Sequence, residues 1–114
     1  MYYLGIDLGG TNIAVGLVNE NLEIVLKDSV KTLTSRPTNE IIDDMAALCK
    51  SLVERAGITF DEVEYLGVAA PGSIDPVNGI VRYSNNVKML DYPLANELKN
   101  RLPIKKVYLE NDAN

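Results

Sequence analysis

The fold follows from one stretch near the N-terminus, residues 4–12, which reads Leu4-Gly5-Ile6-Asp7-Leu8-Gly9-Gly10-Thr11-Asn12. Alternation of large apolar residues with Gly5 and Asp7 predicts a strand over residues 3–8, with the leucines and the isoleucine on one face. Two glycines follow; they can adopt backbone angles that other residues avoid, and they let a ligand approach the main chain. Successive N–H groups in such a turn can point at an anion, and Thr11 adds a hydroxyl donor. The stretch therefore predicts a phosphate held by the turn, with a cation near Asp7.

The segment after this turn distinguishes it from the two commonest phosphate-binding motifs. Residues 13–18 form another apolar run, which predicts a strand rather than the start of a helix. The turn also lacks the lysine and the glycine spacing of the G-x-x-x-x-G-K-[ST] and G-x-G-x-x-G motifs. We therefore expect it to be the tip of a β-hairpin. A Gly-Gly hairpin without a ligand is the alternative, against which Asp7 before the turn and Thr11 after it favour a bound phosphate.

The segment D-L-G-G-T-N, residues 7–12, resembles the first phosphate motif of the actin-like ATPase and sugar-kinase superfamily. Within it, the chain resembles the ROK family of bacterial sugar kinases and sugar-responsive repressors, specifically its glucokinase-like members. The resemblance implies that four loop residues hold the phosphates of ATP, namely Gly9, Gly10, Thr11 and Asn12. It also implies that Asp7 acts through Mg²⁺, with intervening waters because this ion dehydrates reluctantly.

Composition limits the classes of protein to which the chain can belong. Its 114 residues, 46% of them hydrophobic, are enough for one domain with a real core and argue against disorder. A net charge of −5 without clustered Lys and Arg argues against nucleic-acid binding. One cysteine excludes an internal disulfide, and the absence of histidine leaves proton transfer to carboxylates or hydroxyls. We see no secretory signal and no membrane span, which predicts a cytoplasmic protein.

The middle of the chain predicts a third strand, a helix and a fourth strand. Residues 22–32 extend an antiparallel meander in which residues 13–18, apolar on both faces, are expected to be central and covered on both sides. A helix is expected from Pro37, in its first turn, to Gly57, a natural stop. Its apolar positions recur at helical spacing, and the single cysteine among them is interpreted as a small core residue. Residues 63–70 then predict a strand parallel to an earlier one.

Two loops after the fourth strand have features of a sugar site. The strand ends in Pro71-Gly72, and residues 67–75 resemble the ROK segment in which a strand end approaches the sugar. A short strand over residues 80–83 leads to Ser84-Asn85-Asn86, whose amides can donate to and accept from sugar hydroxyls. In ROK sugar kinases an asparagine of this loop contacts the sugar; Asn86 is the closest match, and Asn85 is the neighbour that stays open. Simple turns on a polar surface are the alternative for both loops.

The C-terminal part adds a helix, a fifth strand and a candidate base. Asp91 is expected to cap the helix, with Pro93 in its first turn. A strand over residues 106–109 leads to residues 110–114, E-N-D-A-N, which resemble the ROK catalytic segment. The resemblance implies that Asn111 and Asp112 bind the sugar and that Asp112 accepts the proton of its hydroxyl. The alternative is a strand end whose Asn and Asp cap a following helix.

Together these elements predict an α/β domain of the ribonuclease H-like, actin-like ATPase type, with a mixed five-stranded sheet in the order βββαβαβ. The first three strands are expected to be antiparallel, and the fourth and fifth to run parallel to the first. Carboxyl ends of parallel strands meet at one edge of a sheet, where ligands bind in open α/β sheets. Asp7, Gly72 and Asp112 would share that edge and form one crevice for phosphate and sugar.

The predicted function is ATP-dependent phosphorylation of a hexose hydroxyl by a glucokinase-like enzyme. The implied partners are ATP, Mg²⁺ and a hexose, without nucleic acid or membrane, and the complete protein is expected to be a homo-oligomer. ROK proteins are longer than this chain, so residues 1–114 are expected to be an N-terminal lobe. The absent second lobe would carry the adenine site, further sugar ligands and often a zinc site. The alternatives are the lobe of a sugar-sensing ROK regulator and a non-catalytic actin-like binding module; the intact Asp112 favours catalysis over both.

Overall fold

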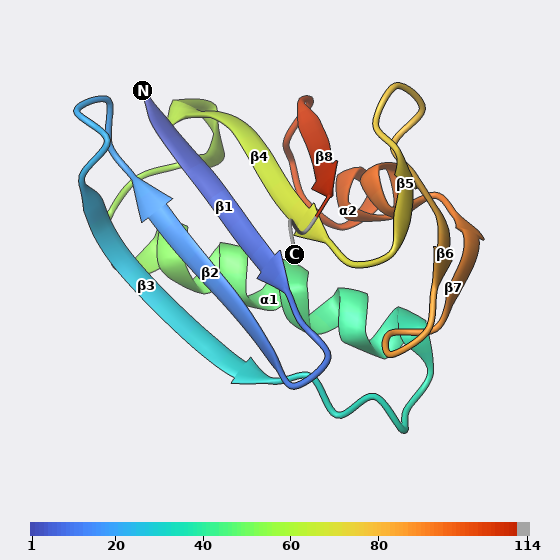
Figure 1. The fold of residues 1–114 in the computed structure, drawn as a ribbon. Coiled ribbons are helices and arrows are strands. Elements are labelled where there is room, and N and C mark those ends of the chain that lie inside the picture. Colours follow the sequence, from blue (N-terminus) through green and yellow to red (C-terminus); the bar gives the residue numbers. More distant parts are fainter. Residues whose placement is uncertain (112–114) are drawn as a thin grey trace.

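Two β-sheets and two helices make up the fold in a computed structural model that describes residues 1–111 (Figure 1). The first sheet has five strands, which are, in spatial order, β3 (Ile24–Lys31), β2 (Asn12–Val18), β1 (Tyr2–Leu8), β4 (Val63–Ala70) and β8 (Val107–Asn111). The second sheet has three strands, β5 (Ser73–Asp75), β6 (Ile80–Ser84) and β7 (Met89–Tyr92). The two α-helices are α1 (Thr38–Arg55) and α2 (Leu94–Arg101), and a short 3₁₀-helix, η1 (Phe60–Glu62), lies between α1 and β4 in the chain.

Strand directions in the five-stranded sheet agree with the sequence-based prediction. β1 pairs antiparallel with β2, and β2 pairs antiparallel with β3. β4 runs parallel to β1 and β8 runs parallel to β4, so three carboxyl ends meet at the same edge. The α/β fold with a mixed sheet in the order βββαβαβ is therefore confirmed. The three-stranded sheet is inserted between β4 and α2.

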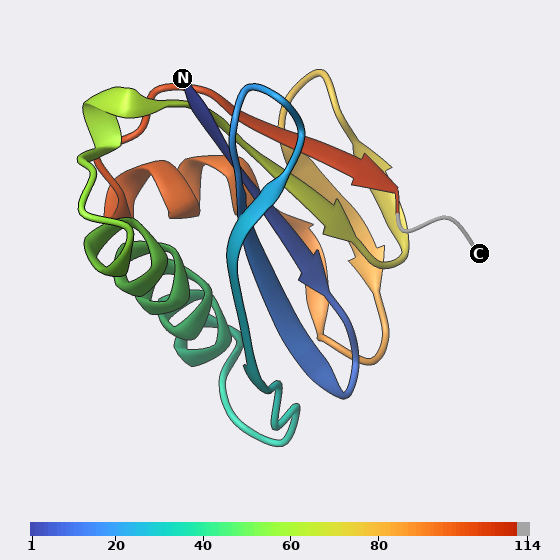
Figure 2. The same ribbon diagram turned by 90° about the vertical axis from the view of Figure 1, so that its left-hand side faces the viewer.

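Both helices lie on the same side of the five-stranded sheet (Figure 2). In β2 the side chains of Ile13, Val15 and Leu17 are buried toward the helices, whereas Ala14 between them is exposed. The expectation that this strand is covered on both faces is therefore wrong for the described residues. The sequence is apolar on both faces of this strand and therefore did not reveal that one face is uncovered. A small side chain such as Ala14 tolerates exposure as well as burial.

Helix α1 supplies the largest part of the core beneath the sheet. Its buried face repeats at helical spacing, as predicted, and consists of Ile41, Ile42, Met45, Ala46, Leu48, Cys49, Leu52 and Val53. Burial raises the pKa of the Cys49 thiol to about 12, which fits a core residue. Pro37 lies just before the helix rather than in its first turn. After the helix, Gly57 adopts a φ of 72°, and its N–H donates to the carbonyl oxygen of Glu54, so the predicted stop is confirmed.

Other boundaries differ from the prediction because local side chains or long-range pairing set them. The third strand begins at Ile24, since the side chain of Asn19 accepts hydrogen bonds from the N–H groups of Asn21 and Glu23 and extends the turn. Strands β5 and β7 were not predicted, because three- and four-residue strands form only by pairing with β6. β7 extends through Asp91, so the expected cap of α2 is wrong, and Pro93 precedes the helix instead.

Candidate functional site

The turn between β1 and β2, residues 9–12, is called here the Gly loop. The N–H of Gly9 donates to the carbonyl oxygen of Asn12 over 3.0 Å, which closes the turn. Neither Gly9 nor Gly10 has a positive φ, so the expectation that they use glycine-specific backbone angles is wrong. Close packing explains why glycine fits at these two positions. A Cβ on Gly9 would lie 3.0 Å from the carbonyl oxygen of Asn12. A Cβ on Gly10 would lie 3.2 Å from the Cβ of Asn86.

Asn86 reaches the Gly loop from the turn between β6 and β7, residues 85–88, called here the Asn turn. The amide nitrogen of Asn86 lies 3.3 Å from the position that a Cβ on Gly10 would occupy. The Asn turn is anchored to the start of α1, because the hydroxyl of Thr38 donates to the carbonyl oxygen of Lys88 over 2.6 Å. Asn85 and Asn86 are both exposed. The loop predicted for phosphate and the loop predicted for sugar are therefore neighbours.

Gly72 and Asn111 join the ends of two parallel strands. Gly72 follows β4 with a φ of 78°, and a Cβ there would overlap the carbonyl oxygen of Tyr83, so only glycine fits. The side-chain amide of Asn111, the last residue of β8, donates to the carbonyl oxygen of Gly72. This bond uses one of the two amide hydrogens, and the amide oxygen of Asn111 is an acceptor that takes no part in it.

The predicted site residues gather at one edge of the five-stranded sheet. Asp7, near the end of β1, is exposed, and the Gly loop begins two residues later (Figure 1). Gly72 lies two residues after the end of β4, and Asn111 is the last residue of β8. Thr11 and Asn12 are exposed in the Gly loop itself. The predicted base, Asp112, lies outside the described residues.

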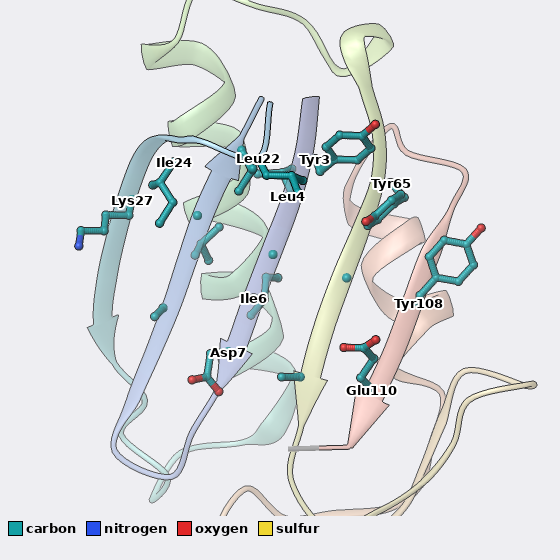
Figure 3. Close-up of a pocket in the computed structure, with 17 residues that line it drawn as sticks. Tyr3, Leu4, Ile6, Asp7, Leu22, Ile24, Lys27, Tyr65, Tyr108 and Glu110 are labelled. Atoms are coloured by element: carbon teal, nitrogen blue, oxygen red, sulfur yellow. The ribbon is translucent and has the colours of Figure 1, made fainter. Parts of the chain in front are cut away.

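A trough of about 790 Å³ crosses the exposed face of the sheet and ends near the Gly loop (Figure 3). Its floor is formed by glycines in register on neighbouring strands, Gly5, Gly16 and Gly67. Three tyrosine rings lie along one end, with centroids 5.0 Å apart for Tyr3 and Tyr65 and 5.6 Å apart for Tyr65 and Tyr108. Asp7 and Glu110 stand toward the other end. Sequence reasoning missed this trough, since its signal, glycines at matching positions, appears only once the strand register is known.

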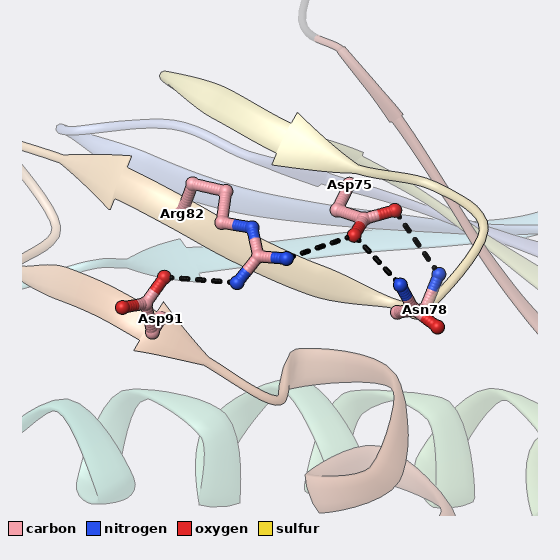
Figure 4. A network of polar contacts seen from close by, with 4 residues as sticks. All are labelled: Asp75, Asn78, Arg82 and Asp91. Carbon is pink, nitrogen blue, oxygen red and sulfur yellow. Dashed lines mark hydrogen bonds and ion pairs between the residues drawn. The ribbon is translucent and has the colours of Figure 1, made fainter.

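A polar network stabilises the three-stranded sheet beside the site (Figure 4). The guanidinium of Arg82 bridges two carboxylates, lying 3.1 Å from Asp75 and 3.1 Å from Asp91. Asn78 donates to Asp75 from both its backbone and its side chain, at 3.2 and 2.8 Å. The hydrogen bonds from Asn78 and the charge of Arg82 hold the pKa of Asp75 below its ordinary value. Asp91, with a φ of 47°, thus pairs with Arg82 rather than capping a helix.

The described residues hold neither a metal centre built from side chains alone nor a membrane-spanning helix. Within residues 1–111, no three His, Cys, Asp or Glu side chains come close enough together to hold a metal ion. Across the helices that the structure describes, none has the length and apolar character needed to cross a membrane. A cation at the Gly loop would therefore need the phosphates of a ligand, or other groups, besides Asp7.

Known proteins resemble this chain in both sequence and fold. The ROK family matches residues 3–114, almost the whole chain. The chain belongs to the ROK family. The glucokinase of Thermotoga maritima is 41% identical over 112 residues, which cover 97% of this chain and 33% of that protein. The N-acetyl-D-glucosamine kinase of Haemophilus influenzae is 35% identical and covers 100% of the chain and 35% of its own length.

Solved structures of ROK proteins have the same fold. The ROK glucokinase of Streptomyces griseus, crystallised with glucose and AMPPNP, has a TM-score of 0.85 and 31% identity, covering 100% of this chain and 34% of its own. The ROK hexokinase of Thermus thermophilus has a TM-score of 0.84 and 30% identity, covering 100% of this chain and 36% of its own. A ROK transcriptional regulator with a TM-score of 0.82 is only 16% identical, so this likeness concerns the fold alone. The chain thus spans about a third of the length of these relatives.

Proposed function

We propose that this chain is the N-terminal lobe of an ATP-dependent hexose kinase of the glucokinase type. The names of its relatives, glucokinase and N-acetyl-D-glucosamine kinase, support a hexose as substrate. The structure of a relative with AMPPNP supports ATP as phosphate donor. The observation that carries the proposal is the approach of Asn86 to Gly10, which brings a loop suited to sugar hydroxyls against a loop suited to phosphate.

The Gly loop is the proposed site of the ATP phosphates. Gly9 and Gly10 have no side chains that could fill the space over the turn, and Thr11 and Asn12 are exposed beside it. Asp7 offers an exposed carboxylate two residues before the loop, and carboxylate oxygens are ligands that Mg²⁺ prefers. We propose that Asp7 holds this ion through water. When bound, Mg²⁺ would neutralise charge that develops on the phosphate oxygens.

The sugar is proposed to lie between the Asn turn, Gly72 and Asn111. The side-chain amides of Asn85, Asn86 and Asn111 can donate to and accept from hydroxyl groups. The carbonyl oxygen of Gly72 orients the Asn111 side chain. Asp112 follows Asn111 in the sequence and is the proposed base for the attacking hydroxyl.

Phosphoryl transfer depends on positioning and on charge neutralisation more than on covalent help. The residues of this chain would hold the sugar hydroxyl and the terminal phosphate on adjoining loops, within one crevice. Asp112 would accept the hydroxyl proton as the new oxygen–phosphorus bond forms. Groups outside this chain would have to bind the adenine and exclude water, so the isolated 114-residue chain is expected to be inactive.

The test is the substitution Asp112→Asn in the complete gene product that contains this chain. Asparagine keeps the shape and can hydrogen-bond the hydroxyl but cannot accept its proton. The kcat for ATP-dependent hexose phosphorylation is therefore expected to fall by about 10²–10⁴-fold, with a smaller change in the KM for the sugar. Glucose and N-acetylglucosamine are the substrates to assay, together with the isolated chain.

A matched control is Asp61→Asn, which removes an exposed carboxylate in η1, at the opposite end of the parallel strands. It should leave kcat unchanged. Normal turnover by Asp112→Asn would show that Asp112 is not the base. Enzyme-like turnover by the isolated chain would overturn the two-lobe proposal. Sugar binding by the complete protein without any phosphorylation would favour the regulator.

A further inference from the structure

Thr32, immediately after β3, is a buried polar residue. Its side chain is 0% exposed, and among the described residues only Ser84 shares the combination of a polar side chain and burial. A buried hydroxyl destabilises a fold unless it makes a hydrogen bond. Thr32 exposes none of its surface, unlike the exposed Asp7 and Asn86, so a ligand cannot touch it in this conformation. What its polar groups bind therefore indicates its role.

Both hydrogen bonds that Thr32 donates end on the Gly loop. Its hydroxyl donates to the carbonyl oxygen of Gly9 over 2.8 Å, and its N–H donates to the carbonyl oxygen of Thr11 over 2.9 Å. In a planar trans peptide the C=O and the next N–H point in opposite directions, and this chain has no cis peptide among its described residues. Fixing the carbonyl of Gly9 on Thr32 therefore directs the N–H of Gly10 away from the core, outward from the turn.

The position of Thr32 is fixed by Arg36, which in turn pairs with a carboxylate on α1. The guanidinium of Arg36 donates twice to the carbonyl oxygen of Thr32, over 3.0 and 2.8 Å. The same guanidinium lies 2.7 Å from the carboxylate of Asp44, on the helix. Hydrogen bonds to a charged donor are stronger than neutral ones, so the position of Thr32 is well defined. A continuous path of polar contacts thus runs from Asp44 through Arg36 and Thr32 to Gly9.

We infer that Thr32 is a positioning residue for nucleotide binding: it directs the N–H of Gly10 toward the phosphates without touching them. The inference rests on the proposed function, since it takes the Gly loop as the phosphate site. A preoriented donor binds an anion more tightly because the loop loses less conformational freedom on binding. Thr32 is therefore a determinant of affinity for ATP rather than for the sugar.

The experiment compares Thr32→Val and Thr32→Ser in the complete gene product. Titration calorimetry measures the Kd for ATP with Mg²⁺ and, separately, the Kd for glucose and N-acetylglucosamine. Valine keeps the shape and loses the hydroxyl, so it should weaken ATP binding about tenfold and leave sugar binding within about twofold. Serine keeps the hydroxyl and should restore ATP binding to near the wild-type value. Equal weakening of both ligands, or unchanged ATP binding, would overturn the inference.

Two further variants separate positioning from a loss of stability. Thr59→Val removes a capping threonine at the far end of the domain, before η1, and should lower Tm without changing either Kd. Arg36→Lys removes the paired donors from Thr32 and should weaken ATP binding selectively; if Thr32→Val does not fold, an unchanged Kd here overturns the inference. Wild-type protein that binds ATP but phosphorylates no hexose overturns the proposed function alone. Wild-type protein that binds no ATP overturns both.

Discussion

Gly10 shows at the scale of one residue how a missing side chain makes room in the candidate site. Its φ is not positive, so the left-handed backbone strain that favours glycine does not exclude a larger residue here. The exclusion comes from Asn86, whose Cβ would lie 3.2 Å from a side chain on Gly10, closer than carbon atoms at rest. Any substitution here must move the Asn turn or project into the space above the Gly loop. Either outcome disturbs the proposed contact between phosphate and sugar.

We expect Gly10→Val in the complete gene product to abolish ATP-dependent hexose phosphorylation while the protein stays folded. The branched side chain would occupy the proposed phosphate path, and displacement of reacting groups by about 1 Å costs about 10²-fold or more in rate. Steady-state kinetics and a thermal melt measure the two effects. The control is Gly16→Ala, where a Cβ meets nothing within 4 Å. Near-normal turnover, or an ATP complex with phosphates away from this turn, would contradict the assignment.

At the scale of elements, the three-stranded sheet carries the Asn turn to the Gly loop. Its strands are short and form few ladder hydrogen bonds, so side-chain contacts and tight turns help to hold the strands together. Gly79, with a φ of 69°, lets the turn between β5 and β6 pack on Ala95 of α2, whose N–H donates to the Gly79 carbonyl oxygen over 3.1 Å. Arg82 of β6 joins Asp75 of β5 to Asp91 of β7. One guanidinium therefore connects all three strands.

The pairing of Asp75 predicts a pH dependence of stability. Its pKa is lower in the folded state, so ionised Asp75 stabilises the fold fully above its unfolded pKa, about 4, and this contribution disappears as the pH falls through the folded pKa. Asp75→Asn should therefore lower Tm by a few degrees at pH 7. The difference in Tm from wild type should shrink below about pH 4. A difference in Tm that is constant from pH 7 to pH 3 would contradict this role.

For the whole molecule, one core lies between the five-stranded sheet and the two helices. It joins strands from both ends of the chain, since buried residues of β1 and β8 both belong to it. Cys49 lies in this core with 0% of its surface exposed, and it is the only cysteine of the chain. Its thiol can therefore react only when the packing between α1 and the sheet opens.

We expect the 114-residue chain to fold by itself and to protect Cys49 from alkylation. At pH 8 without denaturant, labelling should be at least about 10³-fold slower than for free cysteine, because the unfolded fraction of a stable domain is that small. Labelling should become fast at the same denaturant concentration at which circular dichroism shows unfolding. Fast labelling without denaturant would mean that this core does not form in the isolated chain.

Much of the fold could be predicted from local patterns, and the candidate site residues were proposed from them. Alternation over residues 3–8 identified β1, helical spacing identified α1, and Gly57 marked its end. These features depend on neighbours within a few positions, so the sequence determines them directly. The residues of the Gly loop and the Asn turn were proposed as site residues from such patterns and from the resemblance to ROK proteins. Their roles stay predictions, and Asp112 lies outside the described residues.

Only the tertiary structure decided which of these residues meet. Asn86 reaches Gly10 through the pairing of β6 with β7, a strand that is too short to predict. Asp91 fits the pattern of a helix cap, but an arginine nine positions away binds it instead. Thr32 had no motif at all, and its hydroxyl binds a carbonyl 23 positions earlier in the chain. Contacts of this kind depend on the register and twist of the sheet, which arise from the packing of the whole core and not from any single stretch of sequence.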